Sequence, residues 1–208
     1  FADSLNFIQN DVNRPNRILH EGDKFGYDYD ANITRMNAWG QGQWKFDKVD
    51  LYASLELSNM SYFRTGNVKN GLFQDNSFGD SEKEQFSNYA AKGGASYKIN
   101  GRNYLFVNLS SMTRAPYFEN AFVSARTRNQ LAPGLKNEKV ISAEGGYLLR
   151  SPKTKARAVA YYTQFSDQTN TISFYHSDYR TFVNYTLTNI DKRHTGVELS
   201  LDHNFGQG

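Results

Sequence analysis

The chain has 208 residues, a formal net charge of +3 and a hydrophobic fraction of 38%. The charge is spread along the chain, so there is no basic stripe of the kind that nucleic-acid binding requires. Cysteine is absent, which excludes disulfides and thiolate metal sites. Because the chain starts at Phe1 without a targeting segment, we expect it to be a fragment of a longer protein.

Membrane helices are not predicted, because no apolar run approaches the roughly 18 to 20 residues that one needs. The mean hydropathy of −0.70 would normally indicate a water-soluble protein. A membrane β-barrel is also compatible with this value, since only alternate residues of its strands face lipid. Aromatic residues reach 15% and proline is rare, with 4 residues, as suits long strands.

The first 30 residues are polar and rich in Asn and Asp, and they predict a long loop. Two strands follow, over residues 32–46 and 49–65, joined by a short turn at Asp47 and Lys48. The second strand alternates strictly. Leu51, Ala53, Leu55 and Leu57 share one face, and Tyr52, Ser54, Glu56 and Ser58 share the other. Such alternation places one face in an apolar medium and the other in water.

The next predicted unit is a long loop over residues 66–84, followed by strands over 85–99 and 102–114. Asn100-Gly101 lies between these strands and is the strongest short hairpin signal, because a type I′ turn requires positive φ at both central residues. A second long loop is predicted over residues 115–137.

Four more strands complete the pattern. They are expected over residues 138–150, 155–166, 179–190 and 194–204. Short turns are predicted at 151–154 and 191–193, and a long loop at 167–178. In the last strand Val197, Leu199 and Leu201 alternate with polar residues.

Short turns therefore alternate with long loops along the whole chain, which is typical of an antiparallel up-and-down transmembrane β-barrel. Most of the eight predicted strands exceed ten residues, whereas globular strands average about 5 or 6 and membrane strands need about 9 to 11. The predicted fold class is all-β, a fragment of about eight strands from a larger barrel. Trp44, Phe46, Tyr97 and Tyr104 lie near the short turns, as an interfacial aromatic girdle would, and we favour this explanation over ordinary β-propensity, which also enriches aromatic residues in strands.

Three segments carry a resemblance to a known family. They are residues 113–119 (Thr-Arg-Ala-Pro-Tyr-Phe-Glu), 135–138 (Leu-Lys-Asn-Glu) and 144–147 (Glu-Gly-Gly-Tyr). Together they resemble the barrel of TonB-dependent outer-membrane receptors, with Asn137 in place of the usual Pro and Gly145 in place of a frequent Leu. Residues 39–41 and 120–122 are most similar to Bacteroidetes members of that family.

The resemblance implies a barrel of about 22 strands with a plugged lumen. It implies location in the bacterial outer membrane and import of a siderophore, glycan, peptide or cofactor with energy transmitted by TonB. Residues 1–208 would be part of one barrel domain, with the plug outside this chain. The expected partners are outer-membrane lipid, the TonB complex through the absent region, the imported ligand and, as a further candidate, a surface lipoprotein. Neither nucleic acid nor a cofactor is expected.

The motif residues are expected to have structural roles. The set is Arg114, Pro116, Glu119, Glu138 and Glu144. Arg114 and Glu119 can pair with each other or with groups in the lumen, and Pro116 ends the hydrogen-bond ladder at a strand tip. Glu144 should face the lumen, because a carboxylate facing lipid costs several kcal/mol.

Ligand contacts are expected from aromatic and Arg side chains of the long loops. The candidates are Tyr62, Phe63, Arg64, Phe73, Phe78, Arg126, Arg128, Phe174, Tyr175 and Tyr179, with His176 beside them. Such side chains can stack on sugars, siderophores or peptides. Packing of the loops on each other over the barrel mouth is the alternative explanation.

Enzymatic motifs are absent, and no metal site is predicted from the spacing of the four histidines. An enzyme is therefore not expected. Two other functions remain open. A secreted β-sandwich that binds glycans would pack Leu51, Leu55 and Leu57 against a second sheet, and a passive porin-type barrel would lack a plug.

Overall fold

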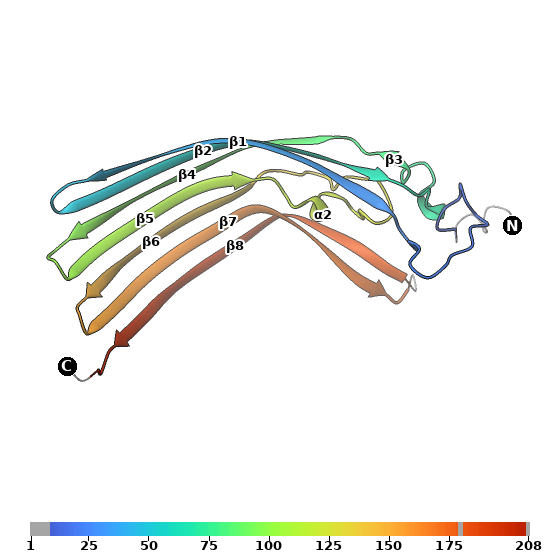
Figure 1. Ribbon diagram of the computed structural model, residues 1–208. Helices are drawn as coiled ribbons and strands as arrows, with labels where there is room; N and C mark the ends of the chain where they lie inside the picture. The colour runs from blue at the N-terminus through green and yellow to red at the C-terminus, as the bar shows by residue number, and fades with distance from the viewer. Residues whose placement is uncertain (1–8, 179–180, 207–208) are drawn as a thin grey trace.

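The structure, a computed structural model, describes residues 9–178 and 181–206. These residues form one antiparallel eight-stranded sheet in which neighbours along the chain are neighbours in space, except that the short β3 pairs only with β2 (Figure 1). The strands are β1 (Tyr29–Lys45), β2 (Val49–Gly66), β3 (Gly79–Asp80), β4 (Glu84–Lys98), β5 (Asn103–Arg114), β6 (Glu138–Arg150), β7 (Thr154–His176) and β8 (Thr181–His203). The sheet confirms the predicted all-β, antiparallel, eight-stranded fold.

The two ends of the sheet differ as predicted. The β1–β2, β4–β5 and β6–β7 connections are tight turns at one end, and the long loops gather at the other (Figure 1). At the 100–101 turn, the Asn100 side-chain oxygen accepts the backbone N–H groups of Arg102 and Asn103 at 2.9 and 3.0 Å. This local chemistry fixes the hairpin, as the Asn-Gly pair predicts.

The last quarter of the sheet corrects the sequence prediction. Residues 167–178 are not a long loop and residues 191–193 are not a turn, because β7 and β8 pair with each other from Thr154 to His176. The register shifts between Phe165 and Asn170, and Asp167 and Asn189 both have a φ of 58°. Asp and Asn tolerate this left-handed conformation, so a bulge bends both strands and pairing then resumes. The three strands predicted over residues 155–204 are therefore two, β7 and β8, and the eighth strand of the sheet is the two-residue β3.

The two faces of the sheet follow from the strand register. Directly paired residues on neighbouring strands point to the same face of the sheet, and together they form a row across it. The row through Leu51 contains Trp44, Leu51, Ala95, Val107, Gly145, Ala160 and Val197. The adjoining row through Ala53 also has no charged residue. Leu55 and Leu57 lie on this face too and keep 52 and 58% of their surface exposed, with no second sheet against them among the described residues.

The cluster of buried hydrophobic residues lies at the loop end of the sheet. Tyr62, Phe86, Phe118, Ala121, Phe122 and Ala125 form it. The two helical segments nearby are short, η1 (Gly71–Phe73) and α2 (Phe118–Ala121). In the part of the chain that the structure describes, no helix is long and apolar enough to cross a membrane.

Candidate functional site

The face opposite Leu51 carries a chain of polar side chains from β2, β5 and β6, which passes over Gly94 of β4. Tyr52 Oη donates to Asn108 Oδ1 at 3.0 Å, and Asn108 Nδ2 donates to Glu144 Oε1 at 2.7 Å. Glu144 therefore lies on the polar face, as its predicted inward orientation requires. The row continues from Glu144 to Tyr161 and Gly196.

Glycines make room for this row. A Cβ on Gly94 would overlap Asn108 Oδ1 and the Tyr52 ring, and a Cβ on Gly196 would lie 2.7 Å from Tyr161 Cζ. Gly146 likewise lies under the ring of Phe106. Large side chains thus cover glycines on neighbouring strands, which fixes their rotamers on a surface that is otherwise open.

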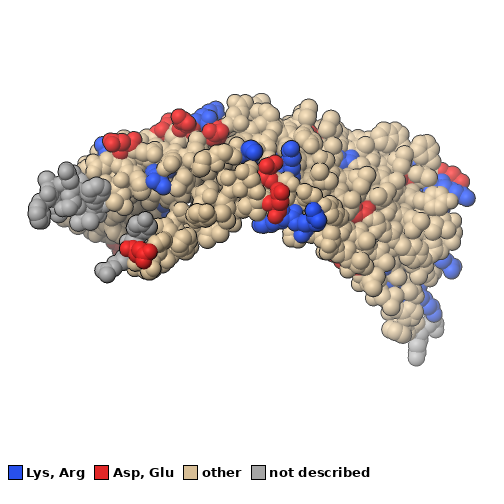
Figure 2. Space-filling model, turned by 180° about the vertical axis from the view of Figure 1, so that it is seen from behind, with Lys and Arg blue, Asp and Glu red and all other residues tan. Residues whose placement is uncertain are grey.

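Ion pairs add charge to the same face. Arg35 pairs with Glu56 at 2.6 Å, and Lys98 pairs with Asp50 at 2.7 Å. The space-filling view shows charged side chains gathered near the middle of the molecule, with further charges toward both ends (Figure 2). Water or a polar partner suits this face, whereas hydrocarbon suits the opposite one.

Arg64, near the end of β2, joins the two long loops. Its side chain is fully buried, and Nε donates to the carbonyl oxygen of Ala125 at 2.6 Å, while Nη1 donates to that of Ser77 at 2.9 Å. Nη1 also contacts Asn129 Oδ1, and the guanidinium lies 5.3 Å from the centre of the Tyr29 ring. One guanidinium thereby holds both loops against the sheet.

Tyr62 has a similar structural position. Its ring is 0% exposed and packs 5.4 Å from Phe86 and 5.7 Å from Phe118, measured between ring centroids. Its hydroxyl donates to the Pro116 carbonyl at 3.4 Å. Burial of Tyr62 and Arg64 favours loop packing over the ligand contact predicted for them.

Arg114 and Glu138 are directly opposite each other in the β5–β6 pair. Arg114 Nε donates to Glu138 Oε2 at 2.7 Å, and the Glu138 side chain is 2% exposed. The other carboxylate oxygen accepts the backbone N–H of Thr169 at 3.4 Å. Glu138, rather than Glu119, is therefore the partner of Arg114, and Glu119 lies in the first turn of α2.

The remaining ligand-contact candidates are dispersed. Arg126 stacks on Tyr27 at 5.1 Å and Arg128 on Phe73 at 4.6 Å, each measured to the ring centroid. Burial lowers the pKa of the Arg128 guanidinium. Phe63 lies on the same face as Leu57, and the exposed aromatic candidates are Phe78, Phe174 and Tyr175 at 56, 44 and 57%. Tyr179 lies outside the described residues.

The histidines do not cluster, since His20 precedes β1, His176 ends β7, and His194 and His203 lie at different positions along β8. His20 is 3.8 Å from Asp23, His194 packs edge-on against Phe165, and His203 bonds to Thr154 at 2.9 Å. Among residues 9–178 and 181–206, no three His, Asp or Glu side chains gather closely enough to hold a metal ion.

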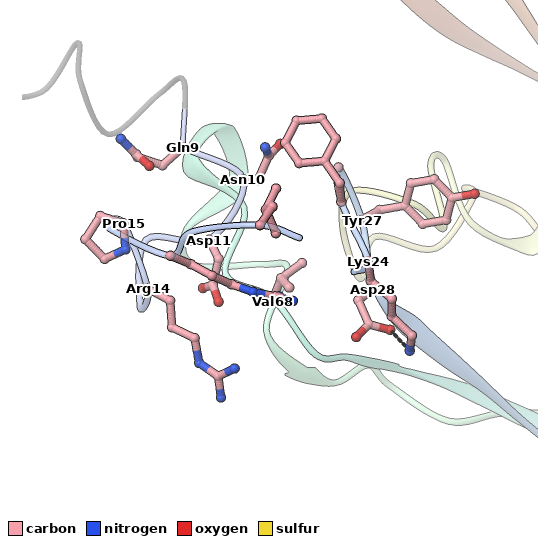
Figure 3. Close-up of a pocket in the computed structure, with 13 residues that line it drawn as sticks. Gln9, Asn10, Asp11, Arg14, Pro15, Lys24, Tyr27, Asp28 and Val68 are labelled. Atoms are coloured by element: carbon pink, nitrogen blue, oxygen red, sulfur yellow. Dashed lines mark hydrogen bonds and ion pairs between the residues drawn. The ribbon is translucent and has the colours of Figure 1, made fainter. Parts of the chain in front are cut away.

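The segment before β1 contains a cavity of about 130 Å³ that sequence reasoning missed. Arg14 and Pro15 lie on one side, Lys24 and Asp28 on the opposite side, and Val68 between them (Figure 3). Backbone bonds tie the segment to the next loop, since Val12 N donates to Lys69 O at 2.8 Å and Gly71 N to Gln9 O at 2.9 Å. The sequence hints at this cavity only through Phe25 and Tyr27, two aromatic residues in a segment that is otherwise rich in charged residues.

Comparison with known proteins identifies the sheet. A family model described as "TonB dependent receptor-like, beta-barrel" matches residues 2–208. Among solved structures, a chain described as "Copper transporter OprC" is 17% identical with a TM-score of 0.63, covering 85% of this chain and 27% of its own. The siderophore receptor PirA from Acinetobacter baumannii is 13% identical with a TM-score of 0.43, covering 86% of this chain and 35% of its own. A search of the curated proteins gives no match.

Proposed function

The chain belongs to the family of TonB-dependent receptor-like β-barrels, and we propose that it forms one arc of the wall of an outer-membrane transporter that binds and imports a nutrient. It spans about a quarter to a third of the similar solved chains, 27 and 35% of their lengths. In this proposal the plug and the remaining strands belong to the same protein outside residues 1–208. Similarity to Bacteroidetes members stays a prediction, and so does a surface lipoprotein partner.

The observation that carries the proposal is the division of the sheet into two unlike faces. The rows through Leu51 and Ala53 cross all seven long strands without a charged side chain. The reverse face has the Tyr52–Asn108–Glu144 chain and the Arg35–Glu56 pair. Because a membrane barrel needs an apolar exterior but tolerates a polar interior, we assign the Leu51 face to lipid and the Glu144 face to the lumen.

The backbone also suits a bilayer. Pairing between neighbouring strands satisfies the backbone groups of the sheet interior, as hydrocarbon demands. Only the outer sides of β1 and β8 lack neighbours in the described sheet. We assign these edges to the strands that close the barrel, since an open edge cannot face lipid.

The long loops would face the cell exterior and take part in ligand capture. Phe78 in one of these loops and Tyr175 near the end of β7 beside them keep more than half of their surface exposed, at 56 and 57%. Similarity to the copper transporter supports the fold and leaves the cargo of this chain unassigned. A siderophore, a glycan, a peptide or a cofactor each remains compatible with aromatic side chains on the loops.

A planar-bilayer recording of the full-length protein tests this function without knowledge of the cargo. A plugged transporter holds its lumen closed, so we expect almost no steady conductance. A steady ohmic current would instead support a passive porin. A water-soluble monomer that does not insert without detergent would support the β-sandwich alternative and contradict a membrane wall.

A second experiment tests energised import. Cells with and without the receptor gene are offered radiolabelled iron chelates, cobalamin and oligosaccharides, each with and without a protonophore. We expect one cargo class to accumulate only with the receptor and only while the proton gradient persists. Accumulation that depends on the receptor but not on the gradient would contradict TonB-dependent transport.

A further inference from the structure

We propose that the cavity formed by residues 9–28 and Val68 binds a small organic anion with one ring-sized apolar group, the chemical class of benzoate. The inference rests on the proposed function only for the exposure of this cavity to the cell exterior. Binding itself follows from the size, the wall chemistry and the charge of the cavity.

Size limits the ligand. The cavity holds about 130 Å³, and an engineered protein cavity of about 150 Å³ is known to bind benzene. A single six-membered ring therefore fits the space. Larger ligands would have to extend into solvent.

The walls offer apolar surface for such a ring. Pro15, Leu19, Phe25 and Val68 line the cavity. Leu19 keeps 40% and Phe25 68% of its surface exposed. A bound ring would remove part of this surface from water, which is favourable in proportion to the apolar area covered.

The charged side chains of the lining favour an anionic ligand. The lining contains three cations, Arg14, Arg17 and Lys24, and two carboxylates, Asp11 and Asp28. Both carboxylates already have partners. Asp11 accepts the backbone N–H groups of Asn13 and Lys69 at 3.0 and 3.2 Å, and Asp28 pairs with Lys24 at 2.6 Å.

The cations of the lining are not all in ion pairs. Arg17 is 3.6 Å from Asp23. Within residues 9–178 and 181–206, the Arg14 guanidinium has no hydrogen bond or ion pair. Arg14 is therefore the cation of the lining that has no ion-pair partner among these residues, and a carboxylate attached to the ring would complement it.

The segment is held in shape before any ligand arrives. Gly22 and Gly26 have φ values of 93° and 84°, which side chains with a Cβ rarely adopt, so these two turns favour glycine. Asn67 N donates to the Asp28 carbonyl at 3.0 Å, fixing the end of the segment on the following loop. A preformed cavity reduces the ordering cost of binding.

Benzoate binding to the full-length receptor in detergent tests the inference, with ligand-observed NMR and isothermal titration as readouts. Benzamide has the same ring without the charge, and acetate has the charge without the ring. We expect both probes to bind at least about fivefold more weakly than benzoate, as the loss of one partly exposed charge contact or of the ring contacts predicts.

Variants locate the site. Arg14→Gln and Phe25→Ala should each weaken benzoate binding about fivefold, whereas Lys153→Gln, at the turn end of the sheet, should leave it unchanged. Correct folding is checked by resistance of each barrel to heat in detergent. Since Arg14 and Phe25 are exposed, the variants should fold normally.

Equal affinity for benzoate and benzamide would overturn the inference, and so would binding that is insensitive to Arg14→Gln. Binding of acetate as tight as that of benzoate would overturn the role of the apolar wall. Neither measurement depends on TonB or on uptake. If the receptor imports its cargo but does not bind benzoate, the cavity assignment alone is refuted. If it binds benzoate but shows no energised uptake, only the transport function is refuted.

Discussion

Arg64 Nε donates to the carbonyl oxygen of Ala125 at 2.6 Å, although the two residues are 61 positions apart in the chain. The same guanidinium reaches Ser77 in the other long loop at 2.9 Å. The two loops are thus joined through one side chain of β2. A buried guanidinium whose acceptors are carbonyl groups packs the two loops against the sheet, and we propose that ligand contact involves the exposed surface around it.

Replacing Arg64 should loosen both loops. Arg64→Met leaves the carbonyls of Ser77 and Ala125 without their donor, and each buried, unpaired acceptor costs about 1–3 kcal/mol. We expect trypsin to cut more rapidly after Lys69, Arg126 and Arg128, while the strands stay protected. Arg35→Met removes an exposed ion pair and is the matched control. Equal cleavage rates in the two variants would show that Arg64 does not hold the loops.

Adjacent glycines in β4 should respond differently to substitution. A Cβ on Gly94 would overlap the Tyr52 and Asn108 side chains and lie 2.8 Å from the Val107 carbonyl oxygen, whereas a Cβ on Gly93 has its nearest neighbour at 3.5 Å. Gly94→Ala should lower the free energy of unfolding by about 1–3 kcal/mol through overpacking. Gly93→Ala should change it little. Urea unfolding of the full-length protein in vesicles measures both, and similar values would contradict the tight lumenal row.

The Lys24–Asp28 pair predicts that the mobility of the cavity segment, residues 9–28, is constant over a wide range of pH. The hydrogen bond from Lys24 holds the pKa of Asp28 below its ordinary 3.8, so this contribution to folding is present above 3.8 and is lost as the pH falls through the lowered value. The hydrogen bond to Asp28 raises the pKa of Lys24 above 10.5, so that contribution is lost only at higher pH.

A spin label at Phe25→Cys should therefore keep constant mobility from about pH 5 to pH 9 and gain mobility below 3.8. Lys24→Met is the control, because it removes the donor and should raise the mobility on the plateau and flatten the acidic step. An acidic step of the same size in both proteins would assign the transition to other groups.

The lipid-facing assignment is tested by a charge on either side of β2. Leu55→Arg should destabilise folding into vesicles by about 2–4 kcal/mol if the residue lies near the midplane. Ser58→Arg places the same side chain three positions further on, on the lumenal face, and should cost much less. Equal folding free energies would contradict the assignment of the faces.

Local signals were enough to predict most of the sheet. The Asn100-Gly101 turn has its own side-chain bonds to Arg102 and Asn103, and the alternation around Leu51 and Leu55 extends over a whole strand. The bulge was missed because Asp167 and Asn189 look like turn residues. Only their pairing context shows that they bend two strands that continue beyond them.

The contacts at the loop end of the sheet could not be predicted in the same way. Arg64 has partners 13, 61 and 65 positions away, and Glu138 contacts Thr169 at a separation of 31. No short motif encodes contacts at such distances. Composition predicted ligand contacts from aromatic and Arg residues of the loops, but it could not separate the buried Tyr62 and Arg64 from the exposed Phe78.

The orientation of the sheet in the outer membrane is the central claim, and the absence of cysteine from this chain makes it directly testable. Single cysteines are introduced at Phe78 in a long loop and at Lys153 in a short turn of the full-length protein. Both are then treated with a membrane-impermeant maleimide. Phe78→Cys should react in intact cells, and Lys153→Cys only after the outer membrane is permeabilised. Labelling of Lys153→Cys in intact cells would contradict a wall whose turns face the periplasm.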